Sequence, residues 1–122
     1  MPFRSLTTVV VKSMACLTVS LALPLIVKAV NKRVPVILDG GIRRGIDIIR
    51  AIAMGADAVA VGRPMLYGLG LGGAQGVESV LNFLNTDLKS TMLLTGAAKL
   101  SDLNPSYIEI VGQNEEYSTL QG

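Results

Sequence analysis

The spacing of apolar and polar residues changes along the chain and predicts strands and helices in turn. Two short, β-branched apolar runs, at 34–38 and 57–61, have the pattern of strands buried on both faces. Apolar residues recur with a helical period over 25–33, 46–54 and 74–95. Helix, strand, loop, helix, strand, loop and helix therefore follow one another, which is the repeat of a parallel α/β fold.

Helix-breaking residues set the expected boundaries of these elements. Pro24 suits the first turn of the first helix, and Asn31 is a plausible stop for it. Gly55 and Gly96 stand where the second and third helices would end. The glycine-rich stretch 65–73 fits either a short helix or a tight packing connector, and we favour the connector.

Each predicted strand ends in glycine and arginine. The first runs into Asp39, Gly40, Gly41, Ile42, Arg43, Arg44 and Gly45, and the second into Gly62, Arg63 and Pro64. Glycines let the backbone bend and approach a ligand closely, and arginine side chains are forks that bind anions. The N-terminus of the helix at 46–54 is expected to add unpaired N–H groups.

Two such loops together predict an anion site. Parallel strands place both loops on the same side of the sheet, so Arg43 and Arg63 should converge there. Taken singly, each loop is explained as well by solvated arginines and turn glycines. The pair of loops favours phosphate binding.

Composition limits the chemistry that the chain can perform. Its 122 residues suffice for one small domain. The 11 basic and 9 acidic residues give a net charge of +2 without a basic stripe, so no nucleic-acid partner is expected. A single cysteine, Cys16, excludes an internal disulfide or a cysteine-cluster metal site. There is no histidine, so this sequence offers neither histidine catalysis nor histidine metal ligation.

The N-terminal region has some features of a targeting segment. Arg4 and Lys12 precede a stretch without charge, residues 13–27. This stretch is shorter than the roughly 20 apolar residues that span a bilayer, and Thr18 and Pro24 interrupt it. We expect no membrane partner and a cytoplasmic location, with a small membrane-associated protein as an alternative.

From about Pro24 to Ile110 the chain resembles the FMN-dependent α-hydroxy-acid oxidase and dehydrogenase family, and within it the lactate oxidases. The segments 28–35, 39–45, 55–64 and 66–77 carry the resemblance. The second and third are shared with other FMN barrels and therefore specify the cofactor better than the substrate. The segment 66–77, which begins Leu-Tyr-Gly, is more specific to the hydroxy-acid enzymes.

The resemblance implies a (β/α)8 TIM barrel, of which this chain supplies the last two βα units. It also implies FMN as the cofactor, a small 2-hydroxy acid such as lactate as the substrate, and a family that often forms homotetramers. The residues expected to hold the FMN phosphate are Asp39, Gly40, Gly41, Ile42, Arg43, Gly62 and Arg63. No metal is expected.

The chain departs from the family in what it lacks. A complete barrel needs about 250 residues, and the family's catalytic base is the histidine of a His-Gly-Gly-Arg-Gln segment that lies upstream of the position of Asp39. That segment has no counterpart here, so no catalytic residue is assigned. The isolated chain is expected to be inactive.

The genetic code suggests why the segment is missing. Read one nucleotide earlier, codons for Thr-Thr-Val-Val-Val-Lys at 7–12 can spell Asn-His-Gly-Gly-Arg-Gln. We therefore interpret residues 1–23 as an irregular N-terminus, out of frame up to about residue 20. Residues 24–111 would be the C-terminal part of the barrel and 112–122 a tail. An alternative is a non-catalytic phosphate- or flavin-binding module that another chain completes.

Overall fold

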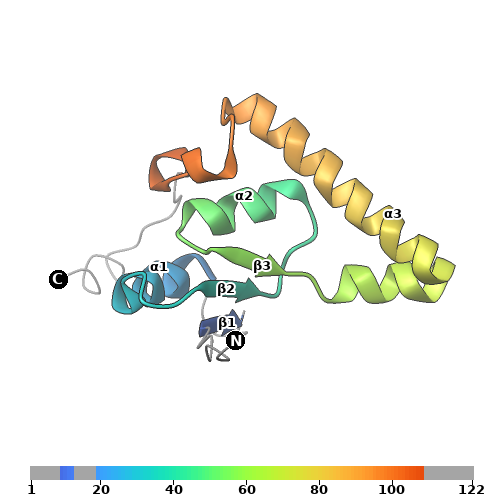
Figure 1. Cartoon of the computed structure of the whole chain (residues 1–122), viewed down its shortest axis with the longest axis horizontal. Coiled ribbons are helices and arrows are strands. Elements are labelled where there is room, and N and C mark those ends of the chain that lie inside the picture. Colours follow the sequence, from blue (N-terminus) through green and yellow to red (C-terminus); the bar gives the residue numbers. More distant parts are fainter. Residues whose placement is uncertain (1–8, 13–18, 109–122) are drawn as a thin grey trace, which may run out of the picture.

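A computed structural model describes residues 9–12 and 19–108 of the chain, with side chains from residue 22 onward. Three strands alternate with three helices, and two short 3-10 turns follow (Figure 1). The elements are β1 (Val9–Lys12), α1 (Val19–Val30), β2 (Val36–Asp39), α2 (Gly45–Ala53), β3 (Ala58–Ala60), α3 (Arg63–Thr95), η1 (Leu100–Asp102) and η2 (Pro105–Tyr107). The predicted 112–122 tail lies outside the described residues.

The strands form one parallel sheet in the order β1-β2-β3. The strands follow one another in chain order, as in the wall of a (β/α)8 barrel. In a doubly wound sheet, by contrast, the order of the strands reverses part-way across the sheet. Both connecting helices cover the same face of the sheet, because Leu23 of α1 and Ala51 of α2 join Val36 and Leu38 in one buried cluster. Coverage of one face is also what a barrel wall requires.

The first strand and the start of the first helix differ from the sequence-based expectation. Residues 1–23 were expected to be irregular, yet β1 pairs with β2 in the register Val9↔Val36, and α1 already begins at Val19. β-branched valines favour a strand at 9–12. Pro24 lies inside α1 rather than in its first turn, and there it removes one backbone hydrogen bond of the helix.

The end of α1 agrees with the prediction. The helix stops at Val30, and Asn31 follows with φ of 48° in the left-handed region that asparagine tolerates. The guanidinium of Arg33 then donates to the carbonyl oxygens of Val30, at 3.0 Å, and Ala29, at 3.1 Å. These bonds satisfy carbonyls that the end of the helix leaves unpaired.

Alternation along β2 separates the core from the opposite face of the sheet. Val36 and Leu38 are buried under the helices, while Ile37 and Asp39 face the other way and are half-buried. Asp57 fixes the register at the start of β2. Its backbone N–H donates to the carbonyl of Val36, and its carboxylate accepts from the N–H of Val36, both at 2.8 Å.

α3 is two helical arms joined at a break. Gly72 and Gly73 have non-helical backbone angles, and Gly73 has φ of 59°. Gly68 and Gly76 face each other across the break, where a Cβ on Gly68 would lie 2.7 Å from the carbonyl oxygen of Gly76. The prediction that 65–73 is a connector was therefore wrong, because 65–71 are helical. The tight packing expected of this stretch is present between Gly68 and Gly76. α3 ends at Gly96, with φ of 78°, as predicted.

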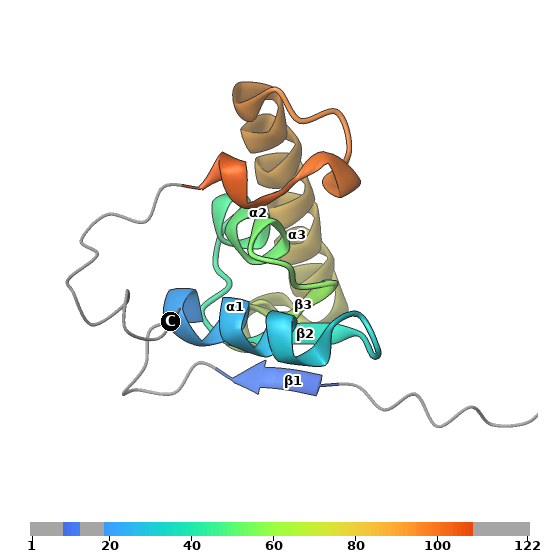
Figure 2. The same ribbon diagram turned by 90° about the vertical axis from the view of Figure 1, so that its left-hand side faces the viewer.

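The second arm of α3 packs against α2. Ile49 and Ala53 of α2 form a second buried cluster with Ala97 and Leu103, which follow α3. Gly45 makes the close approach of the two helices sterically feasible, because a Cβ there would lie 2.5 Å from the carbonyl carbon of Asp87. α2 thus lies between the sheet on one side and α3, η1 and η2 on the other (Figure 1, Figure 2).

Candidate functional site

A pocket of about 390 Å³ opens where β2 and β3 end, and we call it the strand-end pocket. Its lining contains all the residues that were predicted to bind the phosphate. They are Asp39, Gly40, Gly41, Ile42, Arg43, Gly62 and Arg63. Ala60 and Pro64 complete the lining and were not predicted as site residues. The carboxyl ends of adjacent parallel strands meet here, which is why two loops far apart in sequence share one cavity.

The backbone of the first loop requires glycine at two successive positions. Gly40 has φ of 101° and Gly41 has φ of 78°. Residues other than glycine adopt these backbone angles only under strain. Steric space is not the constraint at Gly41, where a Cβ would have no described atom within 4 Å apart from those of its chain neighbours. Ile42 then turns its side chain into the core, with 4% of its surface exposed, so it borders the pocket while anchoring the loop.

Two arginines give the pocket its positive charge. Arg43 and Arg63 come from different strand ends and are both exposed. Neither guanidinium forms an ion pair or a hydrogen bond with another side chain within 22–108. Asp39 adds one half-buried carboxylate to the lining. The pocket is therefore suited to an anion whose neighbouring groups are hydrogen-bond donors.

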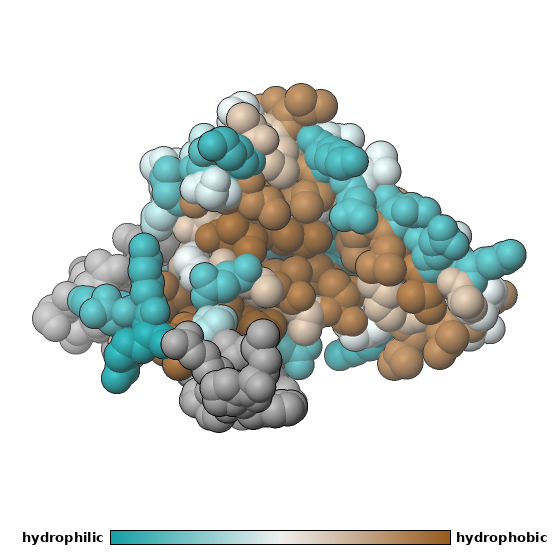
Figure 3. Space-filling view, viewed as in Figure 1, coloured by the Kyte–Doolittle hydropathy of each residue, from teal (hydrophilic) through white to brown (hydrophobic). Residues whose placement is uncertain are grey.

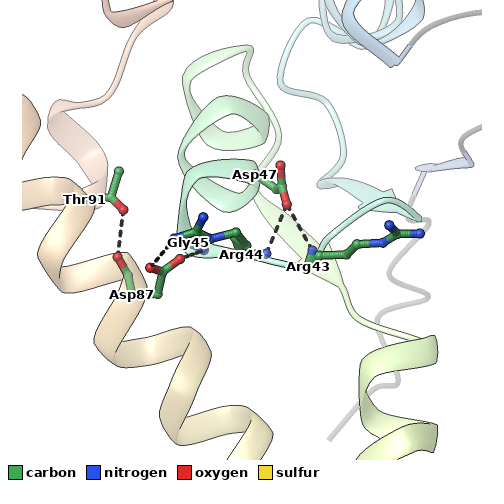
Figure 4. Close-up of polar contacts among 6 residues, drawn as sticks. All are labelled: Arg43, Arg44, Gly45, Asp47, Asp87 and Thr91. Atoms are coloured by element: carbon green, nitrogen blue, oxygen red, sulfur yellow. Dashed lines mark hydrogen bonds and ion pairs between the residues drawn. The ribbon is translucent and has the colours of Figure 1, made fainter.

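The start of α2 does not contribute as the sequence led us to expect. The backbone N–H groups of Arg43 and Arg44 donate to Oδ2 of Asp47, at 3.1 and 3.0 Å (Figure 4). The N–H of Gly45 donates to Oδ2 of Asp87 at 2.7 Å. Carboxylates of the chain itself thus occupy the positive end of α2. The N–H of Gly45, the first residue of α2, is therefore already paired, contrary to the expectation that this helix end offers unpaired N–H groups to a ligand.

Arg44 is also engaged elsewhere. Its guanidinium pairs with Oδ1 of Asp87 at 3.3 Å, and it does not line the strand-end pocket. Figure 4 shows its side chain directed toward Asp87 in the second arm of α3, whereas the side chain of Arg43 extends in the opposite direction. The hydrogen bond from Gly45 and the Arg44 guanidinium lower the pKa of the Asp87 carboxyl below its usual value. Of the two neighbouring arginines, only Arg43 lines the strand-end pocket, and Arg63 is the second arginine of its lining.

The start of α3 is a part of the site that sequence reasoning missed. Gly62 is its N-cap and Arg63 its first residue, and no side-chain hydrogen bond caps this end among the described residues. Because the helix begins inside the pocket, its positive dipole end faces the cavity. Pro64 was the available signal, since proline is favoured in the first turn of a helix.

A second pocket, of about 480 Å³, adjoins the first and has a mostly apolar lining. Tyr67 and Leu71 from the first arm of α3 face Val80 and Phe83 from the second arm, and Arg43 borders this pocket too.

Among residues 19–108, no helix is long and apolar enough to cross a membrane.

The sequence profile of the FMN-dependent dehydrogenases matches residues 14–110. The chain belongs to this family. It is 56% identical over 86 residues to a 2-hydroxyacid oxidase of Dictyostelium discoideum, covering 70% of this chain and 22% of that protein. It is 57% identical over 81 residues to an L-lactate oxidase of Lactobacillus jensenii, covering 66% of this chain and 20% of that protein. The match begins before Pro24, where the resemblance was placed.

Solved structures agree with the sequence matches. A lactate oxidase of Pediococcus acidilactici superimposes with a TM-score of 0.65 at 52% identity, over 68% of this chain and 23% of that one. A sulfite-bound flavocytochrome b2 superimposes with a TM-score of 0.67 at 27% identity, over 83% of this chain and 29% of that one. The chain thus spans about a quarter of the length of these relatives. The predicted fold, the C-terminal part of a (β/α)8 flavoenzyme barrel, is confirmed.

Proposed function

We propose that this chain carries the FMN-phosphate-binding part of an oxidoreductase that acts on the CH–OH group of L-2-hydroxy acids such as lactate. The observation that carries the proposal is the strand-end pocket, where Arg43 and Arg63 border one cavity without a carboxylate partner among the described side chains. The family is FMN-dependent, and the relatives that match include L-lactate oxidases.

The lining fits the phosphate end of FMN. A phosphate monoester carries a charge of about −1.5 to −2 near neutral pH, which Arg43 and Arg63 are suited to balance. Three glycines line the cavity, Gly40 and Gly41 in the loop and Gly62 at the start of α3. Because they have no side chain, a phosphate can approach the backbone closely there. Asp39 was among the residues expected to hold the phosphate. Because its carboxylate accepts hydrogen bonds and repels phosphate, we assign it instead to the ribityl hydroxyl groups next to the phosphate.

Catalysis is assigned to no residue of this chain. When bound, FMN supplies the flavin ring that accepts electrons from the hydroxy acid. What these residues do is bind and orient the cofactor's phosphate end. The sequence contains no histidine, and the family's histidine base therefore has no counterpart in it. We propose that the isolated chain does not oxidise lactate.

The proposal is tested by comparing FMN with riboflavin, which lacks only the phosphate. Flavin fluorescence or calorimetry measures both affinities, and we expect FMN to bind more tightly. Arg43→Gln and Arg63→Gln should each weaken FMN binding about tenfold or more, because each removes a charged hydrogen-bond donor. Riboflavin binding should hardly change in either variant.

Arg50→Gln is the matched control. Arg50 is exposed on α2, and its ion pair with Asp47, at 4.0 Å, lies within its own helix. Equal affinities for FMN and riboflavin in the unsubstituted chain would refute the proposal. Equal losses of FMN affinity in Arg50→Gln and Arg43→Gln would also refute it, since the loss would then depend only on the net charge of the chain.

A second candidate is a flavin- or phosphate-binding module that another chain completes. The observation favouring it is the apolar surface over the bend of α3 (Figure 3), where Tyr67 is 65% and Leu71 92% exposed. Co-expression with the N-terminal three-quarters of a lactate oxidase tests it. Co-purification and restored lactate oxidation would support this candidate, and separate elution of the two chains would contradict it.

We also propose that residues 1 to about 20 are translated out of frame relative to the family. The support is the shifted reading of codons 7–12, which can spell Asn-His-Gly-Gly-Arg-Gln. The coding DNA tests it directly. Codons that do not spell this segment in the shifted frame would end the idea.

A further inference from the structure

Besides the buried side chain of Ile42, two carboxylates hold the loop that lines the strand-end pocket. Asp47 of α2 holds the N–H groups of Arg43 and Arg44 from within the same turn. Asp87 of α3 holds the other side, through the N–H of Gly45 and the guanidinium of Arg44. Asp47 therefore fixes the local shape of the turn, and Asp87 fixes its place relative to the rest of the fold.

Asp87 is well built for this attachment. Its bond to the N–H of Gly45 is 2.7 Å long and spans 42 positions of sequence. The side chain of Asp87 is only 18% exposed, against 66% for Arg44. Because Gly45 has no Cβ, the backbones of α2 and α3 come close enough for a short aspartate to reach the N–H. The hydroxyl of Thr91 donates to the carbonyl of Asp87 at 2.8 Å on the same helix.

The same contact decides which arginine serves the pocket. By pairing with Arg44, Asp87 holds that guanidinium against the second arm of α3, and Arg44 is not among the residues that line the strand-end pocket. Arg43, the preceding residue, then extends to the other side (Figure 4). Without Asp87, the Arg44 guanidinium and the Gly45 N–H would both lose their acceptor, and this side of the loop would lose its polar contacts with α3.

We propose that Asp87 is a positioning residue for the anion loop: it fastens Arg44 and Gly45 to α3 and so sets Arg43 in the strand-end pocket. This inference rests on the proposed binding of the FMN phosphate. Asp87 itself is not among the residues that line the pocket. Its effect on a ligand is therefore indirect.

The test compares Asp87→Ala and Asp87→Asn with Glu78→Ala. Glu78 is an exposed acid on the same helix, and its side chain forms no hydrogen bond within the described residues, so its loss changes the net charge equally. We expect Asp87→Ala to weaken FMN binding about tenfold and to leave riboflavin binding nearly unchanged. Asp87→Asn retains an acceptor for the Gly45 N–H and should lose less. Glu78→Ala should match the unsubstituted chain.

The ratio of FMN to riboflavin affinity separates positioning from general destabilisation. A variant that is merely less folded loses both ligands in proportion, and that result would overturn the proposal. So would equal losses in Asp87→Ala and Glu78→Ala. Arg44→Gln combined with Asp87→Ala should cost no more than Asp87→Ala alone, because the two side chains act through one contact.

A ligand-free measurement keeps this test independent of the proposed function. In amide NMR spectra, Asp87→Ala should shift the signals of Gly40 and Gly41, because the loop is released from α3. Shifts confined to residues 44–45 and to α3 would overturn the inference. If FMN and riboflavin bind the unsubstituted chain equally while these loop shifts occur, the proposed function fails and the positioning role stands.

Discussion

The contact of α2 with α3 at Gly45 allows a prediction of stability from geometry. In Gly45→Ala, the new Cβ would lie 2.5 Å from the carbonyl carbon of Asp87, and the backbone nitrogen of Leu88 is also too close. These are backbone atoms of a long helix, so they cannot rotate away as the end of a flexible side chain would. Relief requires the helices to separate, which also stretches the 2.7 Å bond from the Gly45 N–H to Asp87.

The expected cost follows from this overpacking. Extra volume at a rigid contact costs about 1–3 kcal/mol. The stretched hydrogen bond adds to that cost, so the upper part of the range applies, and we expect the free energy of unfolding to fall by roughly 2–3 kcal/mol. Urea unfolding followed by circular dichroism at 222 nm measures this difference.

Gly70→Ala is the matched control. Gly70 lies in the first arm of α3, and apart from its chain neighbours and the backbone of its own helical turns no described atom lies within 4 Å of its Cβ position. Alanine favours a helix by about 0.5–1 kcal/mol relative to glycine, so this variant should be slightly more stable. The reasoning would be refuted if Gly45→Ala unfolded within about 0.5 kcal/mol of the unsubstituted chain, which is the range of neutral surface changes.

Three further predictions concern other contacts of the fold. Gly76→Ala should open the bend of α3, because its Cβ would meet the backbone of Gly68; reduced helicity and a lower urea midpoint would show this, and an unchanged midpoint would contradict it. Asp57→Ala should lower the free energy of unfolding by about 1 kcal/mol, through loss of the bond from the N–H of Val36, while Asp57→Asn should retain much of it. Urea unfolding of the two variants measures both values, and equal losses would contradict the role of the hydrogen bond. The pKa of Asp87 is lowered from 3.8 in the folded protein, so its stabilising effect is complete above that pH and is lost as the pH falls through the folded value. The difference in stability between the unsubstituted chain and Asp87→Asn should therefore be constant above about pH 4 and shrink below it, and a difference that grew on acidification would contradict this.

The sequence was a good guide to the two strand ends and to two of the helix ends. The two strand-end loops were found because glycine and arginine directly follow apolar runs, and parallel strands bring such ends together. Asn31 and Gly96 were recognised as helix ends for the same local reason. The residues predicted from this pattern, 39–43 and 62–63, all line the strand-end pocket, and their role in binding stays a prediction.

What the sequence did not reveal depends on contacts between distant positions. The capping of α2 by Asp87 joins residues 42 positions apart, and no spacing rule connects them. Arg44 pairs with the same aspartate, so the sequence could not predict that Arg44 lies outside the strand-end pocket. The helical arm at 63–71 was obscured by glycines, whose low helix propensity is outweighed by the packing of Gly68 on Gly76.

The central claim is that the strand-end pocket binds the phosphate of FMN. Amide NMR titration of the chain with FMN, and in parallel with riboflavin, tests it most directly. The account predicts that FMN shifts the signals of Gly40, Gly41 and Gly62 and that riboflavin leaves them in place. Shifts that FMN and riboflavin share, centred on Tyr67 and Phe83 in the apolar pocket, would contradict it.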